Sequence, residues 1–176
     1  MERGQSEQRA RRRQSPFRDF SLLALLVALF IYIAIDRLWE LRLAAERSHV
    51  TWMVGSMQTA LSTTVLARIA SGRIQTLSQL GSSNPFHLMT NLPPTYLGEL
   101  DSPPLESIPG KSWYFDRDSG ELLYRIQFED SFPAIFTAEP LIHFSIQFEY
   151  QDVDGDGRYD PLIDLFSNIE LVSSHR

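Results

Sequence analysis

The sequence contains no cysteine among its 176 residues. Disulfide bonds, thiolate metal sites and cysteine nucleophiles are therefore excluded, and cysteine usage gives no information about the compartment. The sequence also lacks a glycine-rich phosphate loop and a serine nucleophile elbow. Its four histidines stand apart from one another, and we expect each to be solvated: His49, His87, His143 and His175. These absences predict a protein that is not an enzyme.

Positive charge is scarce outside the N-terminus. The formal net charge is -6, and residues 1–19 carry six Arg against three acidic residues, so the remaining chain sums to -9. An acidic domain repels a phosphate backbone, which argues against nucleic-acid binding. The N-terminal arginines are better explained as the cytoplasmic end of a membrane anchor, which resists translocation. We therefore interpret residues 1–19 as a basic cytoplasmic tail.

A hydrophobic run follows this tail directly. Phe20 to Ile35 is sixteen residues without a charge, or roughly 24 Å of helix against a hydrocarbon core of about 30 Å. Leu38 and Trp39 extend the apolar surface, and flanking arginines can snorkel to the interface. The run predicts a transmembrane helix over residues 20–36, with the chain beyond it outside the cytoplasm.

Two other interpretations of this run are weaker. A cleaved signal peptide would need a small-x-small site after the apolar core, but Asp36, Arg37, Leu38 and Trp39 stand there. A buried core helix is disfavoured by the arginine cluster beside the run.

The apolar residues after the hydrophobic run change to helical spacing. They predict an amphipathic helix over residues 37–72 that continues the membrane helix and ends near Ser71-Gly72. Its polar face would carry Arg37, Glu40, Arg47, Gln58 and Arg68. The apolar face is formed by Leu38, Leu41, Ala45, Val50, Val54, Met57, Leu61, Val65 and Ile69.

The C-terminal half of the chain has the pattern of a small sheet. Residues 73–111 predict a short helix over 73–80 and then a proline-rich loop. Period-two alternation predicts strands over residues 112–176, at 112–116, 121–128, 142–150 and 162–172, with Gly120 in a hairpin turn. The predicted fold class is α+β, with a long N-terminal helix packed on a small antiparallel sheet.

One motif carries chemistry. Short carboxylates at alternate positions, with glycines between them, can converge on a hard cation such as calcium. The predicted structural calcium ligands are Asp152, Asp154, Asp156, the Arg158 carbonyl and Asp160. Ile163 stands where an EF-hand has its bidentate glutamate, so this is not an EF-hand. An ordinary Asp/Gly-rich turn between two strands is the alternative.

These features together resemble the type IV pilins and type II secretion pseudopilins, including accessory proteins of MSHA-type pilus loci. The stretches 84–86, 93–98, 110–116 and 120–125 are similar to the sheet region of minor pilin-like proteins. Some pseudopilins also hold calcium in a C-terminal loop. Prepilins are cleaved between Gly and Phe, but here Pro16 precedes Phe17, and no Glu stands at the fifth place after Phe17 or Phe20. This departure favours an accessory subunit that does not polymerise.

The resemblance implies a pilin-like fold and a non-enzymatic, membrane-anchored component of type IV pilus biogenesis or of a type II secretion pseudopilus. It further implies an inner-membrane location with a periplasmic C-terminal domain. The expected partners are other pilin-like or assembly proteins, with no nucleic acid and no small-molecule substrate. The alternative hypothesis is a membrane-tethered periplasmic binding or adaptor domain unrelated to pilins.

Overall fold

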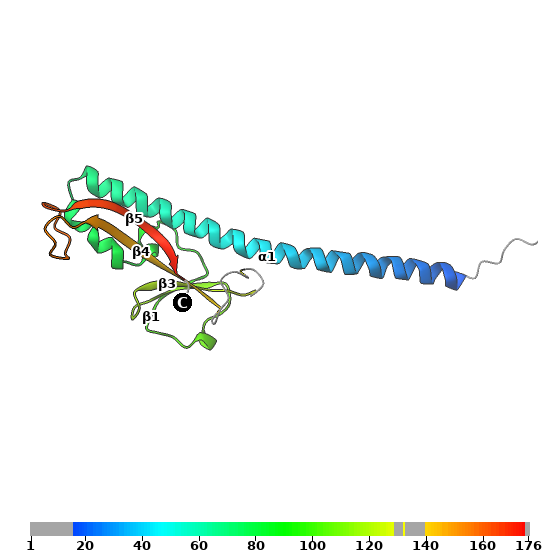
Figure 1. The fold of residues 1–176 in the computed structure, drawn as a ribbon. Helices are drawn as coiled ribbons and strands as arrows, with labels where there is room; N and C mark the ends of the chain where they lie inside the picture. The colour runs from blue at the N-terminus through cyan, green and yellow to red at the C-terminus, as the bar shows by residue number, and fades with distance from the viewer. Residues whose placement is uncertain (1–15, 129–131, 133–139, 175–176) are drawn as a thin grey trace, which may run out of the picture. The chain divides into compact units, whose positions relative to one another are not determined.

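The computed structural model describes residues 16–128, 132 and 140–174. These form two compact units, Met1–Arg42 and Leu43–Arg176. Both contain part of one helix, α1 (Pro16–Ala70) (Figure 1). The predicted basic tail, up to residue 15, lies outside the described residues.

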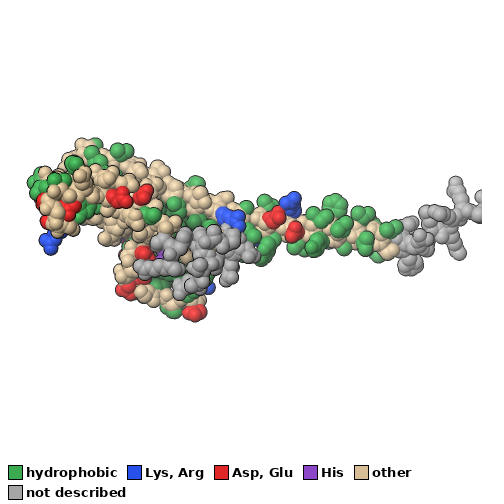
Figure 2. Space-filling view, in the orientation of Figure 1, with side chains coloured by type: hydrophobic (Ala, Val, Ile, Leu, Met, Phe, Trp, Pro, Cys, Tyr) green, Lys and Arg blue, Asp and Glu red, His purple; other side chains and the backbone are tan. Residues whose placement is uncertain are grey.

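The first unit is an apolar stretch of α1. Every side chain from Phe20 to Arg42 is exposed, and large hydrophobic residues such as Phe30 and Tyr32 are each 72% exposed. Figure 2 shows hydrophobic side chains along this stretch. From Phe20 onward α1 is long and apolar enough to cross a membrane. A helix that exposes apolar side chains all round is suited to lipid rather than to water.

The part of α1 in the second unit is amphipathic, but the predicted apolar face is wrong at four positions that are exposed: Leu38, Leu41, Ala45 and Ile69. The buried residues of this part recur every three or four positions, which is the spacing of one helix face: Val50, Met53, Met57, Leu61 and Val65. Helix α1 ends at the predicted place, because Gly72 adopts a φ of 72° and the Arg73 amide donates to the Arg68 carbonyl at 2.8 Å. This is the glycine-terminated helix end in which a left-handed residue closes the last turn.

The predicted polar face of α1 is wrong at two positions, because Gln58 and Arg68 are half-buried rather than exposed. The Gln58 side-chain oxygen accepts a hydrogen bond from the Leu171 amide at 2.8 Å. This bond ties α1 to the last strand of the sheet. Figure 1 shows α1 running beside β4 and β5.

The sheet has five strands in the order β1-β2-β3-β4-β5. Strands β2 to β5 pair antiparallel, but β1 pairs parallel with β2. The sheet is therefore mixed, and the prediction of an antiparallel sheet was wrong. The strand bounds are β1 (Tyr96–Leu100), β2 (Ser112–Asp116), β3 (Glu121–Arg125), β4 (Leu141–Gln151) and β5 (Leu165–Ser174).

Strand β1 lies in the passage predicted as a loop. Gly98 adopts a φ of 97° within it, and the register with β2 shifts between Tyr96 and Glu99. A bulge of this kind removes the regular alternation by which a strand is recognised. The chain returns from β1 to β2 through a short 3-10 helix, η4 (Leu105–Ser107).

The short helix predicted over residues 73–80 is absent as an α-helix. Two 3-10 helices stand there, η1 (Ile74–Thr76) and η2 (Ser78–Ser82), and η3 (Pro85–Leu88) follows. The hydroxyls of Thr76 and Ser83 bond local backbone carbonyls at 2.8 and 2.9 Å. Such side-chain bonds compete with regular helix formation.

Two of the three buried clusters lie between α1 and the sheet, and the third, around Ile108, Tyr114 and Leu123, includes no residue of α1. Val50, Met53 and Met57 of α1 pack in one cluster with aromatic residues of η3 and the sheet. Leu61 and Val65 pack in a second cluster with η2, β4 and β5. The alternation predicted for β4 is confirmed by three buried residues, Ile142, Phe144 and Ile146.

Candidate functional site

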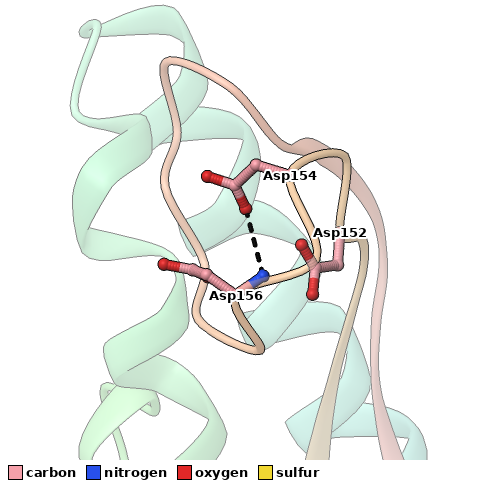
Figure 3. Close-up of side chains that lie close together, drawn as sticks. All are labelled: Asp152, Asp154 and Asp156. Atoms are coloured by element: carbon pink, nitrogen blue, oxygen red, sulfur yellow. Dashed lines mark hydrogen bonds between the residues drawn. The ribbon is translucent and has the colours of Figure 1, made fainter.

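The aspartate loop joins β4 to β5. Gly155 and Gly157 adopt φ values of 76° and 75°, which only glycine adopts without strain. The Asp152 carboxylate accepts hydrogen bonds from both glycine amides, at 2.7 and 2.9 Å. Asp154 accepts from the Asp156 amide at 3.3 Å (Figure 3). The loop therefore curls around its own carboxylates.

Three of the predicted ligands are brought together. One carboxylate oxygen each from Asp152, Asp154 and Asp156 lie within 4.8 Å of one another, and all three side chains are exposed. Asp160 and Arg158 are outside this group. Asp160 accepts a hydrogen bond from the Leu162 amide at 2.9 Å. Three carboxylate oxygens at this separation match the donor chemistry of a hard cation such as calcium.

Asp164 is a residue of this loop that was not among the predicted ligands. It is 5% exposed, and its carboxylate accepts hydrogen bonds from the Val153 amide at 2.9 Å and the Asp160 amide at 2.7 Å. These bonds hold the two ends of the loop together. The sequence does offer one indication that Asp164 belongs to the loop: it stands one residue beyond the last ligand position of an EF-hand loop.

Charge crowding shows in the pKa values of the loop. Hydrogen bonds, led by that from the Gly157 amide, lower the pKa of Asp152. The bond from the Asp156 amide lowers the pKa of Asp154, but partial desolvation by the surrounding loop and the Asp156 charge outweigh it and raise that pKa overall. Burial, then the charge of Asp152, raise the pKa of Tyr150. A divalent cation would relieve this repulsion.

A buried carboxylate joins α1 to the end of β3. Glu46 is 2% exposed and accepts hydrogen bonds from the Tyr124 hydroxyl at 3.0 Å, the Gln127 amide at 2.7 Å and the Phe128 amide at 3.1 Å. Burial, followed by the Glu46 charge, raises the pKa of Tyr124. Sequence reasoning missed Glu46, because a glutamate on a long helix gives no sign of distant partners.

Two of the three described histidines have carboxylate partners, and the expectation that each is solvated is wrong for His143, whose side chain is 18% exposed, but not for His87, whose side chain is 66% exposed. His143 Nδ1 lies 2.8 Å from Glu121 Oε2, joining β4 to β3. His87 Nε2 lies 3.1 Å from Glu99 Oε1, joining η3 to β1. Both pairs link neighbouring elements of the sheet domain, which is the role of a structural contact. His175 lies outside the described residues.

The long helix and the mixed sheet define an α+β protein whose sheet domain is built on the second part of α1. Comparison with protein-family models, with curated proteins and with solved structures found no significant match.

Proposed function

We propose that this chain is a non-enzymatic, membrane-anchored, pilin-like accessory component of type IV (MSHA-type) pilus biogenesis or of a type II secretion pseudopilus. One observation carries the proposal. Helix α1 is continuous from Pro16 to Ala70, with an exposed apolar stretch first and an amphipathic stretch in the domain core after it. Anchor and core are therefore one element, which an unrelated domain on a flexible tether would not need.

The proposed location follows from the charges that flank the apolar stretch. The arginine-rich tail would stay in the cytoplasm, and the acidic sheet domain would lie in the periplasm. The work of the domain would be docking to other pilin-like or assembly proteins. Leu66 of α1 is 67% exposed, so it lies on a face of the domain that a partner could contact.

The aspartate loop enters the proposal as a structural calcium site. Asp152, Asp154 and Asp156 would supply carboxylate oxygens, and the buried Asp164 would fix the loop ends without contacting the ion. Calcium would then order the connection between β4 and β5 and add stability by binding the folded state.

The function is tested by deleting the gene in the source organism and measuring surface piliation and type II secretion. We expect one of the two to be lost and to be restored by the wild-type chain, but not by a form released from the membrane. A photoreactive residue at the exposed Leu66 should crosslink to a pilin-like or assembly protein, whereas one at the buried Met57 should not. Unchanged piliation and secretion in the deletion strain would contradict the proposal.

A further inference from the structure

The loop between β4 and β5 exposes aliphatic side chains as well as carboxylates. Leu162 is 88% exposed, which is the largest value of any large hydrophobic residue in the described part of the chain, the apolar stretch of α1 included. Val153, Ile163 and Leu165 are exposed as well. Single apolar side chains on a surface are ordinary, but several of them in one segment with polar residues around them are typical of an interaction site.

The buried Asp164 holds the segments that carry these side chains close together. Its carboxylate accepts hydrogen bonds from the Val153 amide and the Asp160 amide, so Val153 lies against the turn that contains Leu162. Leu165 pairs with the last residue of β4 at the base of the same loop. Figure 2 shows hydrophobic and acidic side chains together at this end of the domain. The exposed aliphatic residues of the loop are called the loop patch: Val153, Leu162, Ile163 and Leu165.

The turn that carries Leu162 is fixed by its own contacts. The Asp164 amide donates to the Asp160 carbonyl at 2.6 Å, and the Leu162 amide donates to the Asp160 carboxylate at 2.9 Å. The ring centre of Tyr159, which precedes the turn, lies 4.9 Å from that of Phe148 on β4. A leucine contributes to stability when it leaves water. Leu162 is instead held in water at a defined place, so it contributes little to this fold.

The charge around the loop patch indicates what kind of partner would cover it. The segment 152–165 carries five Asp against Arg158 alone, and it stays negative even with a divalent cation bound. Complementary charge on a partner therefore means Lys or Arg. An anionic membrane is disfavoured, because the carboxylates repel its headgroups and the segment contains no Lys, Trp or Phe to hold it at a lipid surface.

We propose that the loop patch docks into an apolar pocket of a partner protein, and that Lys or Arg residues surround this pocket. Leu162 enters the pocket, and the basic residues face the aspartates of the loop. An apolar anchor seated in a pocket, with polar groups around it that exclude water, is the usual arrangement at the centre of a protein–protein interface. This surface is distinct from the face of α1 around Leu66, and docking through it does not require calcium.

Photocrosslinking of the full chain in the source organism tests the proposal. A photoreactive residue replaces Leu162 in one strain and Leu92 in a control strain, because Leu92 is also apolar and 54% exposed but lies outside the loop. We expect position 162 alone to crosslink to one protein, at a peptide that contains Lys or Arg beside apolar residues. Three results would overturn the proposal: crosslinks to lipid only, no protein crosslink above that of position 92, or a crosslinked peptide without a basic residue.

A variant tests the anchoring role of Leu162. With the photoreactive residue at Ile163, Leu162→Ser should lower the yield of the same crosslink about tenfold or more, which is the effect on affinity of no longer burying a leucine. Leu92→Ser is the matched control and should leave the yield unchanged. Both side chains are exposed, so both variants should keep the near-UV circular dichroism of the wild type. An equal yield from the Leu162→Ser and Leu92→Ser strains would show that Leu162 is not the anchor and that the proposal is wrong.

Discussion

Replacing Glu46 by alanine is the sharpest test of how α1 is fixed to the sheet. The change removes the acceptor of three donors: the Tyr124 hydroxyl, the Gln127 amide and the Phe128 amide. The Tyr124 hydroxyl is buried and the two amides are partly buried, and a buried donor left without a partner costs about 1 to 3 kcal/mol. Water reaching the two partly buried amides would re-pair them, so we expect the lower end of the sum. The free energy of unfolding should fall by about 3 to 5 kcal/mol.

Three further variants separate the contributions to this loss. Glu46→Gln keeps the side-chain shape but replaces one carboxylate oxygen by an NH2 group. This group cannot accept a hydrogen bond from the donor that it faces, so the free energy of unfolding should fall by about 1 to 3 kcal/mol. Tyr124→Phe removes one donor and leaves Glu46 its two amides, at a cost of about 1 kcal/mol. The third variant, Glu170→Gln, is the control: Glu170 is exposed on β5, so the same chemical change there should alter the free energy of unfolding by less than about 0.5 kcal/mol.

Urea unfolding of the full chain in non-ionic detergent measures these differences. Trp113 is fully buried, and its ring centre lies 4.7 Å from that of Tyr124. Its fluorescence therefore reports on the junction once the other two tryptophans are replaced by phenylalanine. If Glu46→Ala unfolds at the same urea concentration as Glu170→Gln, the junction does not stabilise the fold and the reasoning is refuted.

Calcium should raise the melting temperature of the full chain and EDTA should reverse this, with about 2.7 kcal/mol of added stability at a hundredfold excess over Kd; a melting temperature unaffected by EDTA would exclude a structural ion. The hydrogen bond from Asn84 is the largest cause that lowers the pKa of Glu99 in the folded state. The unfolded state therefore binds the proton first, and stability should fall as the pH drops below about 4.5. Glu99→Gln should flatten this dependence in acid titrations of the unfolding midpoint, and an unchanged slope would contradict it. Leu61→Ala should cost about 2 to 5 kcal/mol in urea unfolding, whereas Leu66→Ala on the exposed face should cost less than about 0.5 kcal/mol; equal losses would show that the burial pattern of α1 is wrong.

Features that depend on neighbours in sequence were predictable. The burial of Val50, Leu61 and Val65 follows from helical spacing, and that of Phe144 from period two. The aspartate cluster was found for the same reason, since its three carboxylates lie within five residues of one another. Turn glycines were also predictable, because a left-handed backbone is nearly restricted to glycine.

Features that depend on distant partners were not predictable. The donors to Glu46 lie 78 to 82 residues away along the chain, so no local pattern marks this glutamate as buried. Strand β1 was missed because its bulge at Gly98 breaks the alternation. The parallel pairing of β1 with β2 was not predictable either, because it depends on how the chain runs between the two strands and not on the sequence of either strand.

The hydrogen bond between Gln58 and Leu171 spans 113 residues, and this has a consequence for folding during synthesis. Leu171 belongs to the last strand to emerge, whereas Gln58 belongs to the helix that emerges first. Until β5 arrives, the apolar face of α1 around Leu61 has only part of its packing surface. The domain should therefore fold slowly, since contacts of long sequence separation form late. A chain truncated before β5 should be a preferred substrate for chaperones and proteases.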